Sequence, residues 1–148
     1  MSKIIARITA DPIRFEALAA ELAVPQHGAQ ALFVGLVRDE NDGRKVAAVS
    51  YDVHPPLAEK TFREIAEEAL ARFGADLRVA IVHRFGRLAV GEASVAICVG
   101  SAHRDEALQA CRYAIEQIKV RSPIWKQEHY LDGDSEWLAG HSLRPHIP

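Results

Sequence analysis

A helical pattern, a proline and an alternating strand pattern follow one another directly near the end of this chain, and this succession most constrains its fold. From Asp105 to Lys119 the apolar residues recur at the spacing of one helix face. They are Ala107, Leu108, Cys111, Ala114, Ile115 and Ile118. Pro123 ends the helix, because proline lacks an amide hydrogen and pushes Ser122 into an extended conformation. From 124 to 130 side chains alternate between two faces, which predicts a strand with Ile124, Lys126, Glu128 and Tyr130 on one side.

Two lysines lie on either side of this proline. At about 100° per residue, Lys119 projects near Leu108 and Ile115, where the apolar stripe meets the polar face. An amine there is partly shielded from water, which suits acid–base or nucleophilic chemistry. The alternative is a lysine favoured by the helix dipole that extends its ammonium into water. A tight helix–strand connection would bring Lys126 to the same pocket; the alternative is a solvated strand lysine paired with Glu128.

Further cationic residues lie at the ends of predicted elements. His103 and Arg104 open the helix, where unpaired amide groups and a partial positive charge favour an anion such as phosphate. The alternative is that both are solvated residues at a helix start. Arg38 ends an apolar strand at 29–38. If Arg38, His103, Arg104 and the two lysines converge, they form a cationic pocket whose floor is the start of the helix.

Composition bounds the other functions open to the chain. With 148 residues, 49% of them hydrophobic, we expect one domain over 1–148 with a partly loose tail at 136–148. The net charge of −2 gives no reason to expect nucleic acid. Cys98 and Cys111 both fall in apolar patterns, which predicts buried free thiols in a reducing compartment. The seven histidines lack the spacing of metal ligands. We expect no bound metal, no membrane span and a cytoplasmic location.

The remaining elements follow from shorter patterns. We predict strands at 3–8, 29–38, 46–53, 77–83 and 93–100, and helices at 12–22 and 55–73. The near-continuous apolar run of 31–37 predicts a strand buried on both faces. The polar loop at 39–44 predicts an antiparallel hairpin over 30–53, and 84–88 is expected to be a turn.

Several segments together resemble the large, catalytic subunit family of molybdopterin synthase. They are the stretches 33–38, 83–86, 91–92, 101–104 and 119–128, and the similarity spans about 4–137. The resemblance implies an α+β hammerhead fold with a mainly antiparallel sheet and about three helices. It implies an enzyme of molybdenum cofactor biosynthesis, which transfers sulfur to cyclic pyranopterin monophosphate to form the dithiolene of molybdopterin. The sulfur donor would be the C-terminal Gly-Gly thiocarboxylate of a small ubiquitin-like subunit, in a heterotetramer built on a homodimer, with no cofactor of its own.

Residue by residue, the resemblance assigns a site. Lys119 and Lys126 match the two essential lysines, and Arg38, His103 and Arg104 match residues that bind the substrate phosphate and pterin. The residues that flank the same pocket are Leu36, Val37, Gln127 and Glu128. We expect Arg38, Arg104 and the helix start to hold the anion, Lys119 to handle the thiocarboxylate tail, and Lys126 to assist proton transfer.

The tail departs from the family pattern. Family members often carry an arginine shortly after the C-terminal tryptophan, whereas Trp137 is followed by 138–140, His141 and then Arg144. Two other functions stay open at this stage. One is a module that docks a ubiquitin-like sulfur carrier without chemistry of its own, and the other is an unrelated phosphate-ester enzyme.

Overall fold

The computed structural model describes residues 3–139. The elements of that part are β1 (Ile4–Thr9), α1 (Phe15–Leu22), β2 (Ala29–Leu36), β3 (Glu40–Asn41), β4 (Arg44–Val53), α2 (Pro55–Phe73), β5 (Arg78–Arg84), β6 (Gly86–Ala89), β7 (Ala93–Ser101), α3 (Arg104–Arg121), β8 (Ile124–Tyr130), β9 (Gly133–Asp134) and β10 (Leu138–Ala139). Most strand pairs are antiparallel, and the expected α+β class with three helices is confirmed. No helix within 3–139 is long and apolar enough to cross a bilayer.

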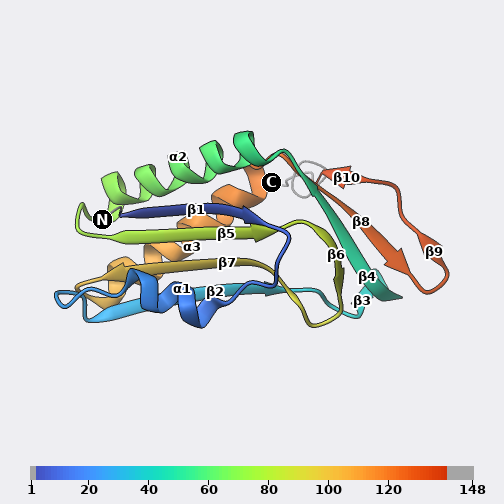
Figure 1. Ribbon diagram of the computed structural model, residues 1–148, viewed down its shortest axis with the longest axis horizontal. Helices are drawn as coiled ribbons and strands as arrows, with labels where there is room; N and C mark the ends of the chain where they lie inside the picture. Colours follow the sequence, from blue (N-terminus) through green and yellow to red (C-terminus); the bar gives the residue numbers. More distant parts are fainter. Residues whose placement is uncertain (1–2, 140–148) are drawn as a thin grey trace.

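The first sheet carries the core of the molecule. Its strand order is β1-β5-β7-β2, with β1 parallel to β5 and the other neighbours antiparallel. Helices α2 and α3 pack on one face, around Phe62 and Ile97, and α1 covers the other face through Leu18 and Leu22 (Figure 1). Burial of these apolar side chains on both faces holds the helices against the sheet.

The second sheet stands beyond one end of the first (Figure 1). Its order is β10-β8-β4-β3, β6 adds to β4, and β9 adds to β8. Strand β8 follows α3 after a two-residue connection, because Ser122 already has extended dihedrals (φ −82°, ψ 138°) and Pro123 prevents further helix. The alternation predicted for β8 is confirmed, since Ile124, Glu128 and Tyr130 are buried on one face and Trp125 is exposed on the other.

The hairpin predicted over 30–53 is wrong. Strand β2 pairs with β7, whereas β4 pairs with β3, β6 and β8, so the two strands belong to different sheets. Strand β2 is also an edge strand, on which Leu32, Phe33 and Leu36 are exposed by 45%, 37% and 58%. The apolar run of β2 predicted a buried strand. Among the described residues, however, no element pairs with the outer edge of β2.

Three smaller predictions also differ from the structure. Helix α1 begins at Phe15 and not at Pro12, and its N-cap Arg14 makes no side-chain capping bond. Residues 86–89 form strand β6 and not a turn, because they pair with β4. Leu108, which was predicted to lie in the apolar stripe of α3, is 60% exposed.

Several other predictions are confirmed. Helix α2 spans Pro55–Phe73 and ends at Gly74, and both cysteines are buried free thiols whose pKa values burial raises to about 11. Leu138 and Ala139 of the predicted loose tail pair with β8 as β10. The rest of that tail, with His141 and Arg144, lies outside the described residues.

A polar cluster joins helices α2 and α3. The guanidinium of Arg121 donates to both carboxylate oxygens of Glu68, at 2.7 and 2.9 Å, and the Tyr113 hydroxyl donates to one of them at 2.6 Å. The hydrogen bonds from Arg121, followed by that from Tyr113, lower the pKa of Glu68 to about 2. These hydrogen bonds to Glu68 stabilise the end of α3 that carries Lys119.

We expect Glu68→Gln to lower the free energy of unfolding by no more than about 1 kcal/mol at pH 7, because solvent screens a carboxylate that is 40% exposed. Folding lowers the pKa of Glu68 below its unfolded value near 4.5, so the charged carboxylate stabilises the fold at pH values above about 4.5. This contribution is lost as the pH falls towards 2. Urea unfolding of the two proteins at pH 7 and pH 3 measures this. A difference between them that grows on acidification would contradict the assignment.

Candidate active site

The end of α3 and the start of β8 place two lysines on one small cavity. Lys119, in the last turn of α3, and Lys126, in β8, line a cavity of about 40 Å³. Its other lining residues are Tyr51, His83, Ile118, Ser122 and Ile124. The expected proximity of the two amines is therefore confirmed, and it results from the tight connection at Pro123.

Two further cavities adjoin this one and extend it into a groove. The next, of about 70 Å³, shares Tyr51 and Lys126 with the first and is also lined by Arg38, Glu128, Leu36 and Val37. The last, of about 570 Å³, again includes Arg38 and is also lined by Asp42 and Gly91. Arg38 and its two neighbours thus lie along one groove that ends at the lysines.

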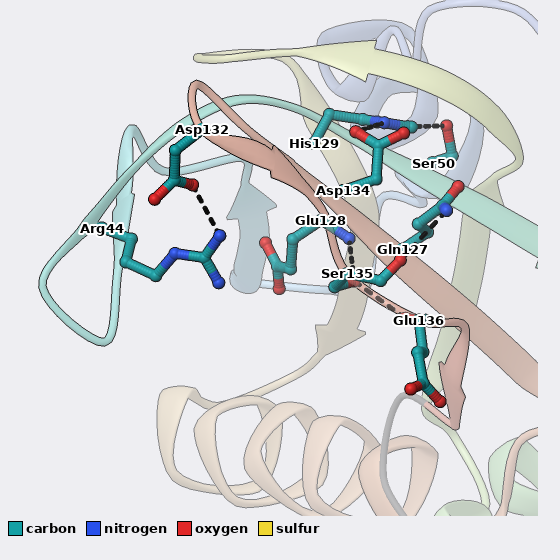
Figure 2. A network of polar contacts seen from close by, with 9 residues as sticks. All are labelled: Arg44, Ser50, Gln127, Glu128, His129, Asp132, Asp134, Ser135 and Glu136. Carbon is teal, nitrogen blue, oxygen red and sulfur yellow. Dashed lines mark hydrogen bonds and ion pairs between the residues drawn. The ribbon is translucent and has the colours of Figure 1, made fainter.

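Glu128 provides Lys126 with a buried counter-ion. Its carboxylate lies 3.3 Å from the Lys126 amine, and Glu128 is only 5% exposed. The Glu128 amide donates to the Ser135 hydroxyl at 2.8 Å, and the Ser135 amide donates back to the Glu128 carbonyl at 2.9 Å (Figure 2). This clamp fixes β8 at the point from which both charged side chains project. The expected pairing of Lys126 with Glu128 is present, but in a cavity wall and not in open solvent.

Gln127 lies away from the cavities. It alternates with Lys126 and Glu128 along β8, and its side-chain amide donates to the Ser135 carbonyl at 3.1 Å (Figure 2). The Gln127 side chain thus holds the segment after β9 by this hydrogen bond. It does not line the pocket that it was predicted to flank.

His83 forms a neutral wall of the two-lysine cavity. Its Nδ1 donates to the Arg84 carbonyl at 2.8 Å, and its ring meets Tyr51 edge-on with centroids 5.1 Å apart. Burial, with a smaller contribution from the Lys119 charge, lowers the His83 pKa to about 4, so the imidazole is uncharged at neutral pH. The predicted site does not include His83. The only signals were its place at the end of a buried strand and in a segment that carries the family resemblance.

The start of α3 lies far from this cavity. Helix α3 has 18 residues and is therefore about 27 Å long, with His103 and Arg104 at one end and Lys119 near the other. Both His103 and Arg104 are exposed. The prediction that they converge with the lysines is wrong for the described chain, and the cavity floor is the end of α3 and not its start. A rigid helix of this length keeps its two ends apart.

Three residues on the opposite face of β8 form a chain that the sequence did not reveal. The Ser50 hydroxyl donates to Nε2 of His129 at 2.6 Å, and Nδ1 of His129 donates to Asp134 at 3.0 Å (Figure 2). The order resembles a Ser/His/Asp triad, although no pattern in the sequence predicts one. The three cavities of the groove do not include these side chains. The two hydrogen bonds therefore connect β4, β8 and β9 and have a structural role.

The site offers cationic and hydrogen-bonding groups for an organic anion. Within residues 3–139 no group of three or more His, Cys, Asp or Glu side chains is arranged to hold a metal ion. Two amines, one arginine and a neutral imidazole suit charge stabilisation and proton transfer at a carboxyl-like group.

Comparisons with known proteins agree on one family. The family model for the MoaE protein matches residues 8–121. The molybdopterin synthase catalytic subunit of Synechococcus elongatus is 48% identical over 132 residues, which cover 89% of this chain and 80% of that protein. The crystal structure of molybdopterin synthase from Staphylococcus aureus matches with a TM-score of 0.84 at 35% identity, over 93% of this chain and 97% of that one. A complex of subunits 1 and 2 of molybdopterin-converting factor from Helicobacter pylori, at 22% identity and a TM-score of 0.73, covers 90% of this chain and 88% of its own and shows likeness of fold.

Proposed function

Because this chain belongs to the MoaE protein family, we propose that it is the catalytic subunit of a molybdopterin synthase and acts in molybdenum cofactor biosynthesis. Its reaction is the transfer of sulfur from the C-terminal thiocarboxylate of a small ubiquitin-like carrier to cyclic pyranopterin monophosphate. The observation that carries the proposal is the small cavity that Lys119 and Lys126 share at the end of a groove.

The chemistry of such a transfer needs groups of the kind found in this cavity. The thiocarboxylate sulfur bonds to a substrate carbon and displaces an oxygen, which leaves an acyl–sulfur bridge between carrier and pterin. Water then adds to the acyl carbon, the carbon–sulfur bond breaks with its electron pair on sulfur, and the tail leaves as a carboxylate. Lys119 stabilises the acyl oxygen and Lys126, oriented by Glu128, moves the proton, while Arg38 holds the substrate phosphate.

The wider part of the groove suits the carrier tail. It has a volume of about 570 Å³, is lined by Asp42 and Gly91, and adjoins the narrower part at Arg38. A Gly-Gly tail has no side chains, so it can continue from this wider part into the two narrower cavities, which larger residues would block. This supports a small partner whose C-terminus reaches the lysines from that side.

A second copy of the chain supplies His103 and Arg104. Strand β2 is an edge strand with exposed Leu32, Phe33 and Leu36, and its Ala29 end pairs with Ser101, just before His103. If two copies pair antiparallel along β2, the Ala29 end of one lies beside the Leu36 end of the other. His103 and Arg104 of one copy then approach Arg38 of its neighbour.

Mixing two inactive variants tests this exchange. We expect Lys119→Ala and Arg104→Ala to be slow as separate homodimers. After unfolding and refolding together, hybrid dimers contain one intact site out of two, so random assortment restores about a quarter of wild-type activity. Activity that stays at the mean of the two separate variants would show that each chain uses its own Arg104 or none.

Reconstitution tests the proposed function itself. The purified chain is mixed with a carrier in its thiocarboxylate form and with cyclic pyranopterin monophosphate, and the pterin product is analysed by mass spectrometry. We expect a product that has gained two sulfur atoms, with carrier released as the carboxylate. Tight binding of the carrier with no sulfur on the pterin would favour the docking module, and would contradict catalysis by this chain.

A further inference from the structure

One residue that lines the two-lysine cavity has a buried side-chain oxygen that the described part of the chain leaves unpaired. The Ser122 hydroxyl oxygen is buried and has no hydrogen-bond partner among the described residues, and Ser122 is only 1% exposed. Its backbone is fully engaged, since its amide donates to the Ile118 carbonyl at 3.3 Å and its carbonyl accepts from the Ile124 amide at 2.9 Å. An unpaired buried hydroxyl is unfavourable, and therefore calls for an explanation.

The position of Ser122 connects this hydroxyl with the lysines. Ser122 is the C-cap of α3, three residues after Lys119, and it lines the same cavity as both amines. Pro123 restricts the backbone of Ser122 to extended dihedrals (φ −82°, ψ 138°), which fixes the position of its Cβ at the cavity. Among the residues that line this cavity, Ser122 alone has a buried polar atom without a partner in the described part of the chain, and His83 already donates to a carbonyl. A ligand atom in the cavity would give the Ser122 hydroxyl its missing partner.

The size of the cavity restricts what that ligand atom belongs to. A volume of about 40 Å³ suits a carboxyl-sized group and is too small for a bicyclic pterin. Arg38, which suits a phosphate, lies in the adjoining cavity. The group beside Ser122 is therefore the end of an acyl chain, in the cavity that both lysines line.

We propose that Ser122 is a substrate-contacting residue whose hydroxyl donates a hydrogen bond to the acyl oxygen of the sulfur-bearing group. The inference rests on the proposed sulfur transfer and adds a residue to it. When water adds to the acyl carbon, the carbon–oxygen π pair moves onto this oxygen, and Lys126 takes a water proton as it passes one of its own to the Glu128 carboxylate. The oxyanion accepts the Ser122 hydrogen bond until the carbonyl re-forms and the carbon–sulfur pair leaves on sulfur.

Ser122→Ala separates this role from a structural one. Because the hydroxyl has no partner among residues 3–139, we expect the melting temperature to stay the same or rise. We expect the single-turnover rate of sulfur transfer to fall roughly 10- to 100-fold, as for one donor among several at an oxyanion, with unchanged carrier affinity. Ser50→Ala is the matched control, since this hydroxyl bonds to His129 on the other face of β4 and β8, and its loss should lower stability without slowing transfer.

A spectroscopic measurement tests the contact without turnover. A carrier labelled with ¹³C at its terminal carbonyl is bound to wild-type protein and to Ser122→Ala, and the carbonyl stretch is recorded by isotope-edited infrared spectroscopy. The hydrogen bond predicts a lower frequency in the wild-type complex than in the variant. Equal frequencies, or equal transfer rates, would overturn the role of Ser122. Absence of transfer by the wild-type chain would instead contradict the proposed function, so the two failures are distinguishable.

Discussion

Replacing Lys119 by alanine is expected to lower the single-turnover rate of sulfur transfer by about 100-fold or more, because an ammonium group no longer faces the acyl oxygen. Carrier affinity and melting temperature should change little, since Lys119 is solvent-exposed along its helix. Rates are measured with enzyme in excess over thiocarboxylated carrier. Lys60→Ala, an exposed lysine on α2, is the control for loss of one positive charge. Transfer at a near-normal rate would remove Lys119 from the mechanism.

Lys126 is the less direct test of the same cavity. Its partner Glu128 is 5% exposed, and removal of the amine leaves a buried carboxylate without its counter-ion 3.3 Å away. Loss of a buried partner destabilises the fold in addition to any effect on chemistry. A slow Lys126→Ala protein is therefore informative only with its free energy of unfolding measured beside it.

Acidification is expected to destabilise the protein through His83. The folded pKa of about 4 lies below the unfolded value of 6.5, so between these values the unfolded chain binds a proton that the folded chain excludes. Stability is therefore full above pH 6.5 and falls as the pH drops towards 4. From pH 7 to 4.5 the loss from this one group is about 2 kcal/mol, at 1.36 kcal/mol per pKa unit.

Urea unfolding at the two pH values, for wild-type protein and His83→Gln, isolates this contribution. Glutamine is neutral throughout, so the variant should lose about 2 kcal/mol less than the wild type over the same interval. The comparison holds even if the variant is less stable at pH 7, because only the change with pH is used. Equal losses in both proteins would show that the imidazole is accessible to protons in the folded state.

Local patterns predicted the part of the site that local structure builds. The periodicity of 105–119, the break at Pro123 and the alternation of 124–130 together placed Lys119 and Lys126 on one cavity, because the connection is too short for other arrangements. Strand pairing was not predictable in this way. The apolar run of β2 is compatible with any neighbour, and its true partner β7 lies more than fifty residues later.

The errors at the site have a common physical cause. Charge type indicated that His103 and Arg104 suit an anion, but the length of an 18-residue helix decides that they cannot share a cavity with Lys119 in one chain. His83 and Ser122 lacked any spacing signal, because a single histidine or serine near the end of an element is usual. Their importance follows from burial and from the partners they have or lack, which only the fold reveals.

A crystal structure of the chain with the thiocarboxylate carrier bound would place the transferred sulfur directly. We predict that the tail enters through the cavity lined by Asp42 and Gly91 and ends with its terminal acyl carbon in the cavity that Lys119 and Lys126 line, its oxygen within hydrogen-bonding distance of Ser122. A tail that ends on another face of the molecule, with no acyl group in the two-lysine cavity, would contradict sulfur transfer at this site.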